Sequence, residues 1–301
     1  MKNFDGFVPE ATNRTHYYLA IFTYSFWGFL PFYFNLFEGV SATEVLVHRV
    51  LWSLLFTLFL LYVLGKHREL FEIFRSIKSI FVLLVSSVFL AINWLVFIYA
   101  TETGQVLQLS IGYYINPLLN MLFGLFLFKE KVGKFSKFAI SFACAGVLLQ
   151  LISTADFPFL AIIIAIAFSC YGATRKLIKI DPLCGLFVET LVLSIPLLGW
   201  LIFASNMQSI AMMTSSIHWT LIFILAGPIT SIPLITFAIA VKKIPYMFMG
   251  FFQYLTPSIL FISAVFIFGE RWSYLDIVTF SLIWLGVLFA SYDVYHTHSP
   301  R

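Results

Sequence analysis

The chain of 301 residues is 61% apolar and only 11% charged, whereas a soluble domain carries about 25% charged residues. So little polar surface cannot cover a water-soluble globule, and the composition therefore predicts an integral membrane protein. The formal net charge of +4 is small, and no basic block interleaved with aromatic residues indicates nucleic-acid binding. Cys144, Cys170 and Cys184 form no Cys-x-x-Cys pair, which argues against a disulfide framework or a zinc site.

Apolar runs separated by short connections fill most of the chain, and each is close to the ~20 residues that a helix needs to cross a bilayer. Because lipid offers no water to backbone polar groups, these runs must be helices. The first run follows a polar tail (1–15) and is too long for a signal-peptide core, so we expect it to remain as a helix. The ten expected helices cover approximately residues 16–37, 43–64, 79–101, 105–128, 135–153, 157–175, 183–204, 218–240, 245–268 and 272–293.

Lys and Arg alternate between successive connections. The connections at 65–78, 129–137 and 175–181 are rich in Lys and Arg, and Lys242 and Lys243 follow the eighth run. The intervening connections carry one basic residue at most. Basic connections remain in the cytoplasm, so we expect both termini to be cytoplasmic.

A degenerate internal repeat supports the same count. Residues 112–149 return without a gap at 252–289. The matched residues, 140 positions apart, include Tyr114 with Tyr254, Pro117 with Pro257, and Glu130 with Glu270. This offset maps the fourth and fifth helices onto the ninth and tenth. Each half then has five helices, and because five is odd, the second half enters from the opposite side.

The sequence therefore predicts an all-α membrane protein with ten transmembrane helices in two inverted five-helix repeats. The repeats are expected at 16–153 and 157–293, and a cytoplasmic tail is expected at 294–301. Inverted repeats are the architecture of secondary transporters, whose binding site lies near the midplane between the halves.

Three polar residues lie near the start of the second expected helix. Glu44 and His48 are four apart and share a face, and Arg49 lies beside that face. At ~1.5 Å per residue, Arg49 is roughly 10 Å inside the outer end. A charge at the centre of a membrane helix costs ~2.5–3.5 kcal/mol. Arg49 is thus a candidate to bind a carboxylate or to hold a gate, and the structural alternative is a pair with Glu44 or a backbone carbonyl. Glu44 and His48 are candidates for gating or coupling.

Glu189, in the seventh expected helix, is the other charge inside an apolar run. Desolvation raises the pKa of a carboxylate, so this residue is a candidate for proton coupling. Its position about two turns from the basic end also fits a solvated structural role.

Buried amides and an indole form a third group of candidates. Asn93 and Trp94 are adjacent in the third expected helix, and Asn116 and Asn120 lie four apart in the fourth. They are candidates for solute binding, and hydrogen bonding between helices is the alternative explanation.

The two matched prolines each remove a helical hydrogen bond. Pro117 frees the carbonyl of Tyr113, and Pro257 frees that of Gln253. We expect both kinked helices to face one cavity between the halves and to bend as access alternates. The side chains expected there are Tyr114, Asn116, Gln253 and Tyr254. The alternative is that neighbouring groups satisfy the carbonyls and the prolines only kink the chain.

Six segments resemble the RarD family, in the EamA branch of the drug/metabolite transporter superfamily. They are EVLVHRVLWS (44–53), NWLVFIYA (93–100), LSIGYYINPLLN (109–120), YGATRK (171–176), GLFVETL (185–191) and GFFQYLTP (250–257). The resemblance covers almost the whole chain in order. It implies a ten-helix transporter of the bacterial inner membrane, with a central cavity for small metabolites, drugs or amino acids.

The sequence thus favours a secondary transporter of small organic solutes, with amino acids or related zwitterions as the first expectation. A proton or another ion is the candidate for coupling, and no cofactor is expected. An intramembrane enzyme would need clustered acid, base or metal ligands, and no catalytic or phosphate-binding motif is present. A non-transporting membrane sensor would normally carry an extramembrane domain or a long loop.

Overall fold

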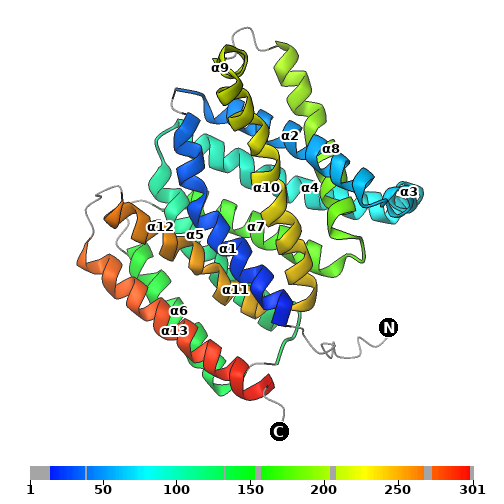
Figure 1. Cartoon of the computed structure of the whole chain (residues 1–301). Coiled ribbons are helices and arrows are strands. Elements are labelled where there is room, and N and C mark those ends of the chain that lie inside the picture. Colours follow the sequence, from blue (N-terminus) through cyan, green and yellow to red (C-terminus); the bar gives the residue numbers. More distant parts are fainter. Residues whose placement is uncertain are drawn as a thin grey trace.

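The computed structural model describes residues 14–37, 39–131, 133–152, 157–203, 208–267 and 273–298. These residues form a bundle of helices and contain no strand (Figure 1). The helices are α1 (Arg14–Phe34), α2 (Ala42–Val63), α3 (His67–Arg75), α4 (Ile77–Glu102), α5 (Val106–Phe126), α6 (Lys134–Ile152), α7 (Phe159–Leu177), α8 (Pro182–Phe203), α9 (Gln208–Ser215), α10 (Ile217–Lys243), α11 (Tyr246–Gln253), α12 (Leu255–Phe266) and α13 (Tyr274–His298), with a 3-10 turn at Asn35–Phe37.

Eight described segments are long and apolar enough to cross a membrane. They are α2, α4, α5, α6, α7, α8, α10 and the α11–α12 segment. The other two predicted runs contain α1 and α13, and the apolar part of α13 is the shorter stretch Tyr274–Ala290. Large apolar side chains such as Tyr62 and Phe266 are 85% and 80% exposed, as expected for a surface that meets lipid. The chain is therefore a multi-pass membrane protein, and the count of ten crossings stays a prediction.

The structure corrects several predicted boundaries. The expected helix at 245–268 is broken at Tyr254 into α11 and α12. Pro257 then lies in the first turn of α12, where a missing N–H leaves no helical bond unmade. By contrast, α5 continues through Pro117. In addition, α13 extends to His298, past position 294 where the cytoplasmic tail is predicted to begin, and Glu270 lies outside the described residues.

Two short helices occur in predicted connections. Helix α3 lies within the basic connection at 65–78, and α9 lies within the connection at 205–217. Both are too short to cross a bilayer, which needs about 20 residues. The apolar periodicity of eight or nine residues gives a weaker signal than a full membrane helix, so neither was expected.

Helices from the two predicted halves pack in matched pairs. Helix α5 packs on α7 as α12 packs on α1, and α4 packs on α7 as α10 packs on α1. Hydrogen bonds follow the same pattern. Asn116 Nδ2 donates to the Ala165 carbonyl at 2.9 Å, and Thr256 Oγ1 donates to the Tyr24 carbonyl at 2.7 Å. Asn116 and Thr256 are 140 positions apart, and each donates to a backbone carbonyl of a helix from the other predicted half.

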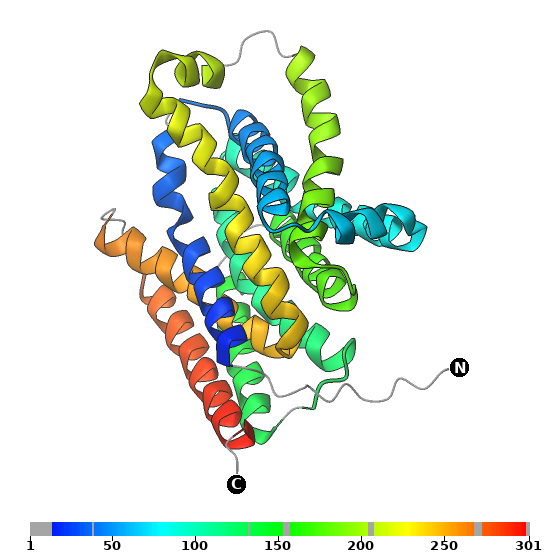
Figure 2. The same cartoon turned by 45° about the vertical axis from the view of Figure 1, so that its right-hand side comes forward.

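Helices α6 and α13 form a pair of their own and lie side by side along one flank of the bundle (Figures 1 and 2). Elsewhere in the bundle, α2 packs on α8 and α5 packs on α11. Close approach at the second contact depends on Gly250, because a Cβ there would lie 2.5 Å from the Pro117 carbonyl oxygen. Small residues at such positions let membrane helices pack closely.

Candidate solute-binding site

Arg49 lies on α2 where α1, α4 and α10 meet. Its Nε donates a hydrogen bond to Thr230 Oγ1 on α10 at 3.2 Å. The guanidinium carbon lies 5.1 Å from the ring centroid of Phe34 and 5.2 Å from that of Trp94. Aromatic faces attract a cation without neutralising it. Phe34 and Trp94 therefore hold the guanidinium in place and leave its charge uncompensated.

Arg49 does not form the ion pair with Glu44 that was one structural alternative for it. Within the described part of the chain, no carboxylate oxygen lies within 4.0 Å of an Arg49 nitrogen. Glu44 instead accepts a hydrogen bond of 2.6 Å from the Ser209 backbone N–H, at the start of α9. Two of the predicted site residues, Arg49 and Trp94, are thus brought together.

The His48 ring contacts Trp52 and Phe223. Its Nδ1 accepts a hydrogen bond of 3.3 Å from Trp52 Nε1, and its ring lies 4.4 Å from that of Phe223. Its Nε2 is buried and has no hydrogen-bond partner among the described residues. Because Nδ1 accepts, the neutral ring carries its proton on Nε2, which can donate to a further acceptor. The gating role of His48 stays a prediction.

A cluster of three amides joins α5 to the end of α11. Gln253 Nε2 donates to Asn116 Oδ1 at 2.5 Å, and Asn120 Nδ2 donates to Gln253 Oε1 at 2.5 Å. Asn120 is fully buried, and its Oδ1 has no partner among the described residues. A buried acceptor without a donor is costly, so this oxygen is a candidate contact for a solute N–H.

Three other predicted site residues form hydrogen bonds within the protein. The Tyr254 hydroxyl donates to the Tyr114 carbonyl at 3.5 Å, and both side chains are buried. Asn93 Nδ2 donates to the Ile164 carbonyl on α7 at 3.1 Å. Asn93 therefore makes the hydrogen bond between helices that was the alternative explanation for it.

The expectation of a solvated Glu189 is wrong. Glu189 is fully buried and lies 3.2 Å from Arg175 Nη1, which is also fully buried. It also accepts hydrogen bonds from Ser86 Oγ at 2.6 Å and from the Tyr171 hydroxyl at 3.3 Å. Arg175 Nη2 donates to the Pro182 carbonyl at 2.9 Å. The sequence placed Arg175 in a basic connection, and no local spacing indicated this pair.

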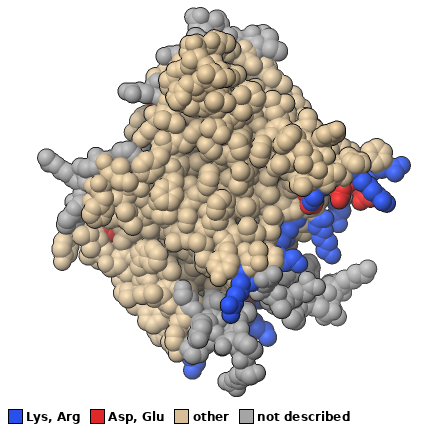
Figure 3. All heavy atoms as spheres, viewed as in Figure 1, with Lys and Arg blue, Asp and Glu red and all other residues tan. Residues whose placement is uncertain are grey.

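Contacts between the predicted halves also gather at the basic end of the bundle. Lys66 forms an ion pair with Asp181. Glu130 accepts hydrogen bonds from the backbone N–H groups of Tyr246 at 2.5 Å and Met247 at 2.9 Å, in the first turn of α11. Burial raises the pKa of Glu130, although these N–H groups and Lys176 oppose the rise. Figure 3 shows Lys and Arg side chains gathered at this end.

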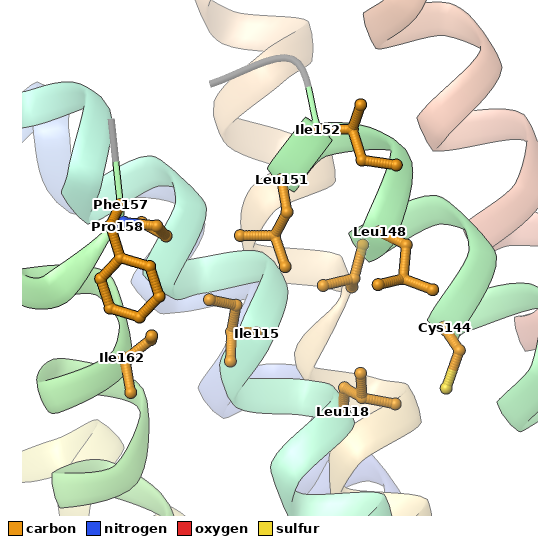
Figure 4. A pocket seen from close by; sticks show the side chains of 10 residues that line it. Ile115, Leu118, Cys144, Leu148, Leu151, Ile152, Phe157, Pro158 and Ile162 are labelled. Atoms are coloured by element: carbon orange, nitrogen blue, oxygen red, sulfur yellow. The ribbon is translucent and has the colours of Figure 1, made fainter. Parts of the chain in front are cut away.

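An apolar groove with a volume of about 630 Å³ lies between α5, α6 and α7. Figure 4 shows side chains such as Ile115, Leu118 and Cys144 lining it. None of the predicted site residues lines this groove. Among the described residues, no group of three His, Cys, Asp or Glu side chains is placed to hold a metal ion.

These features define a class: a multi-pass helical membrane protein with an uncompensated cation where several helices meet, as expected of a transporter. The model of the EamA-like transporter family matches residues 15–152. An uncharacterised transporter of Vibrio cholerae is 35% identical over 275 residues, which cover 91% of each chain. Protein RarD of Escherichia coli is 34% identical over 280 residues, which cover 93% of this chain and 94% of that protein.

The chain belongs to the RarD family of EamA-like transporters, as the sequence predicted. It is a membrane transporter, and its relatives point to transport rather than catalysis. A protein of known crystal structure, 16% identical, superposes with a TM-score of 0.71 over 95% of this chain and 99% of its own. That likeness shows a shared fold.

Proposed function

We propose that the protein is a secondary transporter of the bacterial inner membrane that moves small organic solutes bearing a carboxylate, such as amino acids, related metabolites or drugs. Two inverted five-helix halves, 16–153 and 157–293, alternate access to a site between them, with both termini in the cytoplasm. The matched packing of α5 on α7 and α12 on α1 supports this arrangement, as does the basic end of the bundle.

The environment of Arg49 is the observation that carries the proposal. A guanidinium presents planar donors that match a carboxylate, and a hydrogen bond to a charged group contributes about 1.5–3 kcal/mol. Here the guanidinium has aromatic neighbours and one neutral hydrogen bond within the described residues. A solute carboxylate would supply the missing charge, and Phe34 and Trp94 would contact an apolar body.

The amide cluster supports an amino acid as the solute. Asn120 Oδ1 is an acceptor that lacks a donor among the described residues, and an ammonium group supplies three donors. The break between α11 and α12 lies directly after Gln253. Bending at this break, near Pro257, would move Gln253 relative to α5 and Pro117 as access alternates. Glu44, His48 and Glu189 are the candidates for gating or coupling in this cycle.

The test is solute counterflow with purified protein in proteoliposomes. Labelled phenylalanine should enter, and unlabelled phenylalanine should compete far better than phenylalaninamide, which lacks the carboxylate. Arg49→Gln should abolish this preference. Lys137→Gln is the matched control because it removes an exposed cation far from Arg49. Equal competition by the acid and its amide, for each amino acid that is transported, would overturn the role of Arg49.

A further inference from the structure

Helix α3 lies where chain connectivity holds it at the membrane surface. Three residues, 64–66, join it to α2, and Ser76 alone joins it to α4. Both α2 and α4 are long and apolar enough to span the bilayer. Their shared end, and therefore α3, lies where the bilayer meets water. Figures 1 and 2 show α3 projecting sideways from the bundle.

One face of α3 packs on the protein and leaves other apolar side chains uncovered. Ile73 is buried in a cluster that includes Leu61 of α2 and Leu183 of α8. Phe71 and Phe74 remain 61% and 46% exposed. Beyond Ser76, Ile77 and Phe81 at the start of α4 are 85% and 64% exposed. An amphipathic helix with such a face buries it at the boundary between headgroups and acyl chains.

The charges on α3 are sorted around this apolar face. Arg68 and Arg75 are seven residues apart, so they lie on the same side of the helix, next to Phe71. The Arg75 guanidinium carbon lies 5.1 Å from the centroid of the Phe71 ring. Glu69 and Glu72 lie on the side away from Phe74, and Glu72 is 3.7 Å from Arg68. The cations therefore border the apolar face and the carboxylates face water.

We propose that α3 and the first turn of α4 form a binding site for anionic phospholipids. Arg68, Arg75 and Lys78, all exposed, bind the headgroup phosphate, while Phe71 and Phe74 enter the upper acyl region. Arg suits this role because its planar fork binds phosphate through two hydrogen bonds. Basic residues beside an amphipathic helix favour anionic headgroups. The site is separate from Arg49 and does not depend on the proposed solute.

Native mass spectrometry of the full chain with equal amounts of phosphatidylglycerol and phosphatidylcholine tests the site. The parent protein should retain phosphatidylglycerol several-fold more than phosphatidylcholine. Arg68→Gln/Arg75→Gln/Lys78→Gln should bring the ratio close to one. Lys131→Gln/Lys134→Gln/Lys137→Gln is the matched control: it removes three exposed cations at the same end and should keep most of the preference.

Two further measurements sharpen the result. Glu72→Gln releases Arg68 from its carboxylate and should increase the phosphatidylglycerol ratio. Hydrogen exchange of the segment 64–78 in nanodiscs should be slower with phosphatidylglycerol than with phosphatidylcholine, and inorganic phosphate should not reproduce the protection. An equal loss of preference in both triple variants, or protection that depends on protein concentration through a second copy of the chain, would overturn the proposal.

Discussion

Arg49 and Arg175 are two arginines of one helix bundle with opposite surroundings. Arg175 is fully buried, pairs with Glu189 and donates to the Pro182 carbonyl. Arg49 is half-buried, has aromatic neighbours, and lies beyond 4.0 Å of every carboxylate in the described residues. Among the described residues, a carboxylate compensates the charge of Arg175, and none compensates that of Arg49.

This difference separates a structural charge from a binding charge. A buried ion pair must be complete, because removing one partner leaves an uncompensated charge in a medium of low dielectric constant. Arg175 can therefore release Glu189 only at a large cost. Arg49 makes fewer contacts that a solute would have to replace. Variants that remove each charge, its partner or its neighbour should therefore behave differently.

Glu189→Gln should destabilise the fold most, by about 3–5 kcal/mol, because it leaves Arg175 buried without a counter-charge. The measurement is thermal unfolding of the purified protein in detergent. The double variant Arg175→Met/Glu189→Leu removes both charges and should recover most of the loss. A single variant as stable as the parent protein would show that Arg175 is not held as a structural pair.

Arg49→Lys should reduce transport about 10- to 100-fold, as expected for losing about 1.5–3 kcal/mol from a charged hydrogen bond. Lysine keeps the charge but loses the planar fork. Thermal stability should change by less than about 1 kcal/mol, because no ion pair is broken. The measurement is initial uptake at matched protein levels in the membrane. A loss of stability with unchanged uptake per inserted molecule would show that Arg49, like Arg175, is a structural charge and not a binding charge.

Thr230→Val should weaken transport by about 2- to 10-fold, because a neutral hydrogen bond contributes about 0.5–1.5 kcal/mol. Thr230 Oγ1 accepts the Arg49 Nε–H at 3.2 Å, and valine keeps nearly the same shape without the acceptor. The loss should appear as a higher half-saturation concentration. In an Arg49→Gln background, Thr230→Val should add nothing. An equal additional loss there would place Thr230 outside the Arg49 site.

Asp181→Asn should have the smallest effect, at most about 1 kcal/mol, because Lys66 and Asp181 are partly exposed. Burial acts to raise the pKa of Asp181, but Lys66 and the backbone N–H groups of Leu183 and Cys184 lower it overall. A carboxyl with a lowered pKa stabilises the fold above its unfolded pKa of about 3.9 and loses this as pH falls through the folded value. The stability difference should therefore be constant between about pH 5 and 9. A stability difference that disappears within this pH range would contradict the lowered pKa of Asp181.

Apolar runs were sufficient to predict the eight described segments that can span a membrane, because a membrane span must be long and must satisfy its own backbone. The six family segments were sufficient to predict the RarD family. Pro257 marked a disturbance in the ninth run, since proline cannot continue an unbroken pattern of hydrogen bonds. The equivalent Pro117 gave no such break, and α5 packs against both α7 and α11.

Composition and residue order are enough to identify the membrane class, the succession of apolar helices, and Arg49 and Glu189 as charges inside apolar runs. The partners of these two charges depend on how the helices pack. Glu189 meets Ser86, which is 103 positions away, and Arg49 meets Thr230, which is 181 positions away. Spacing along one helix indicates which residues share a face, but the register between helices comes from the packing of the whole bundle. That packing gave one arginine a carboxylate and left the other with aromatic rings and a hydroxyl group.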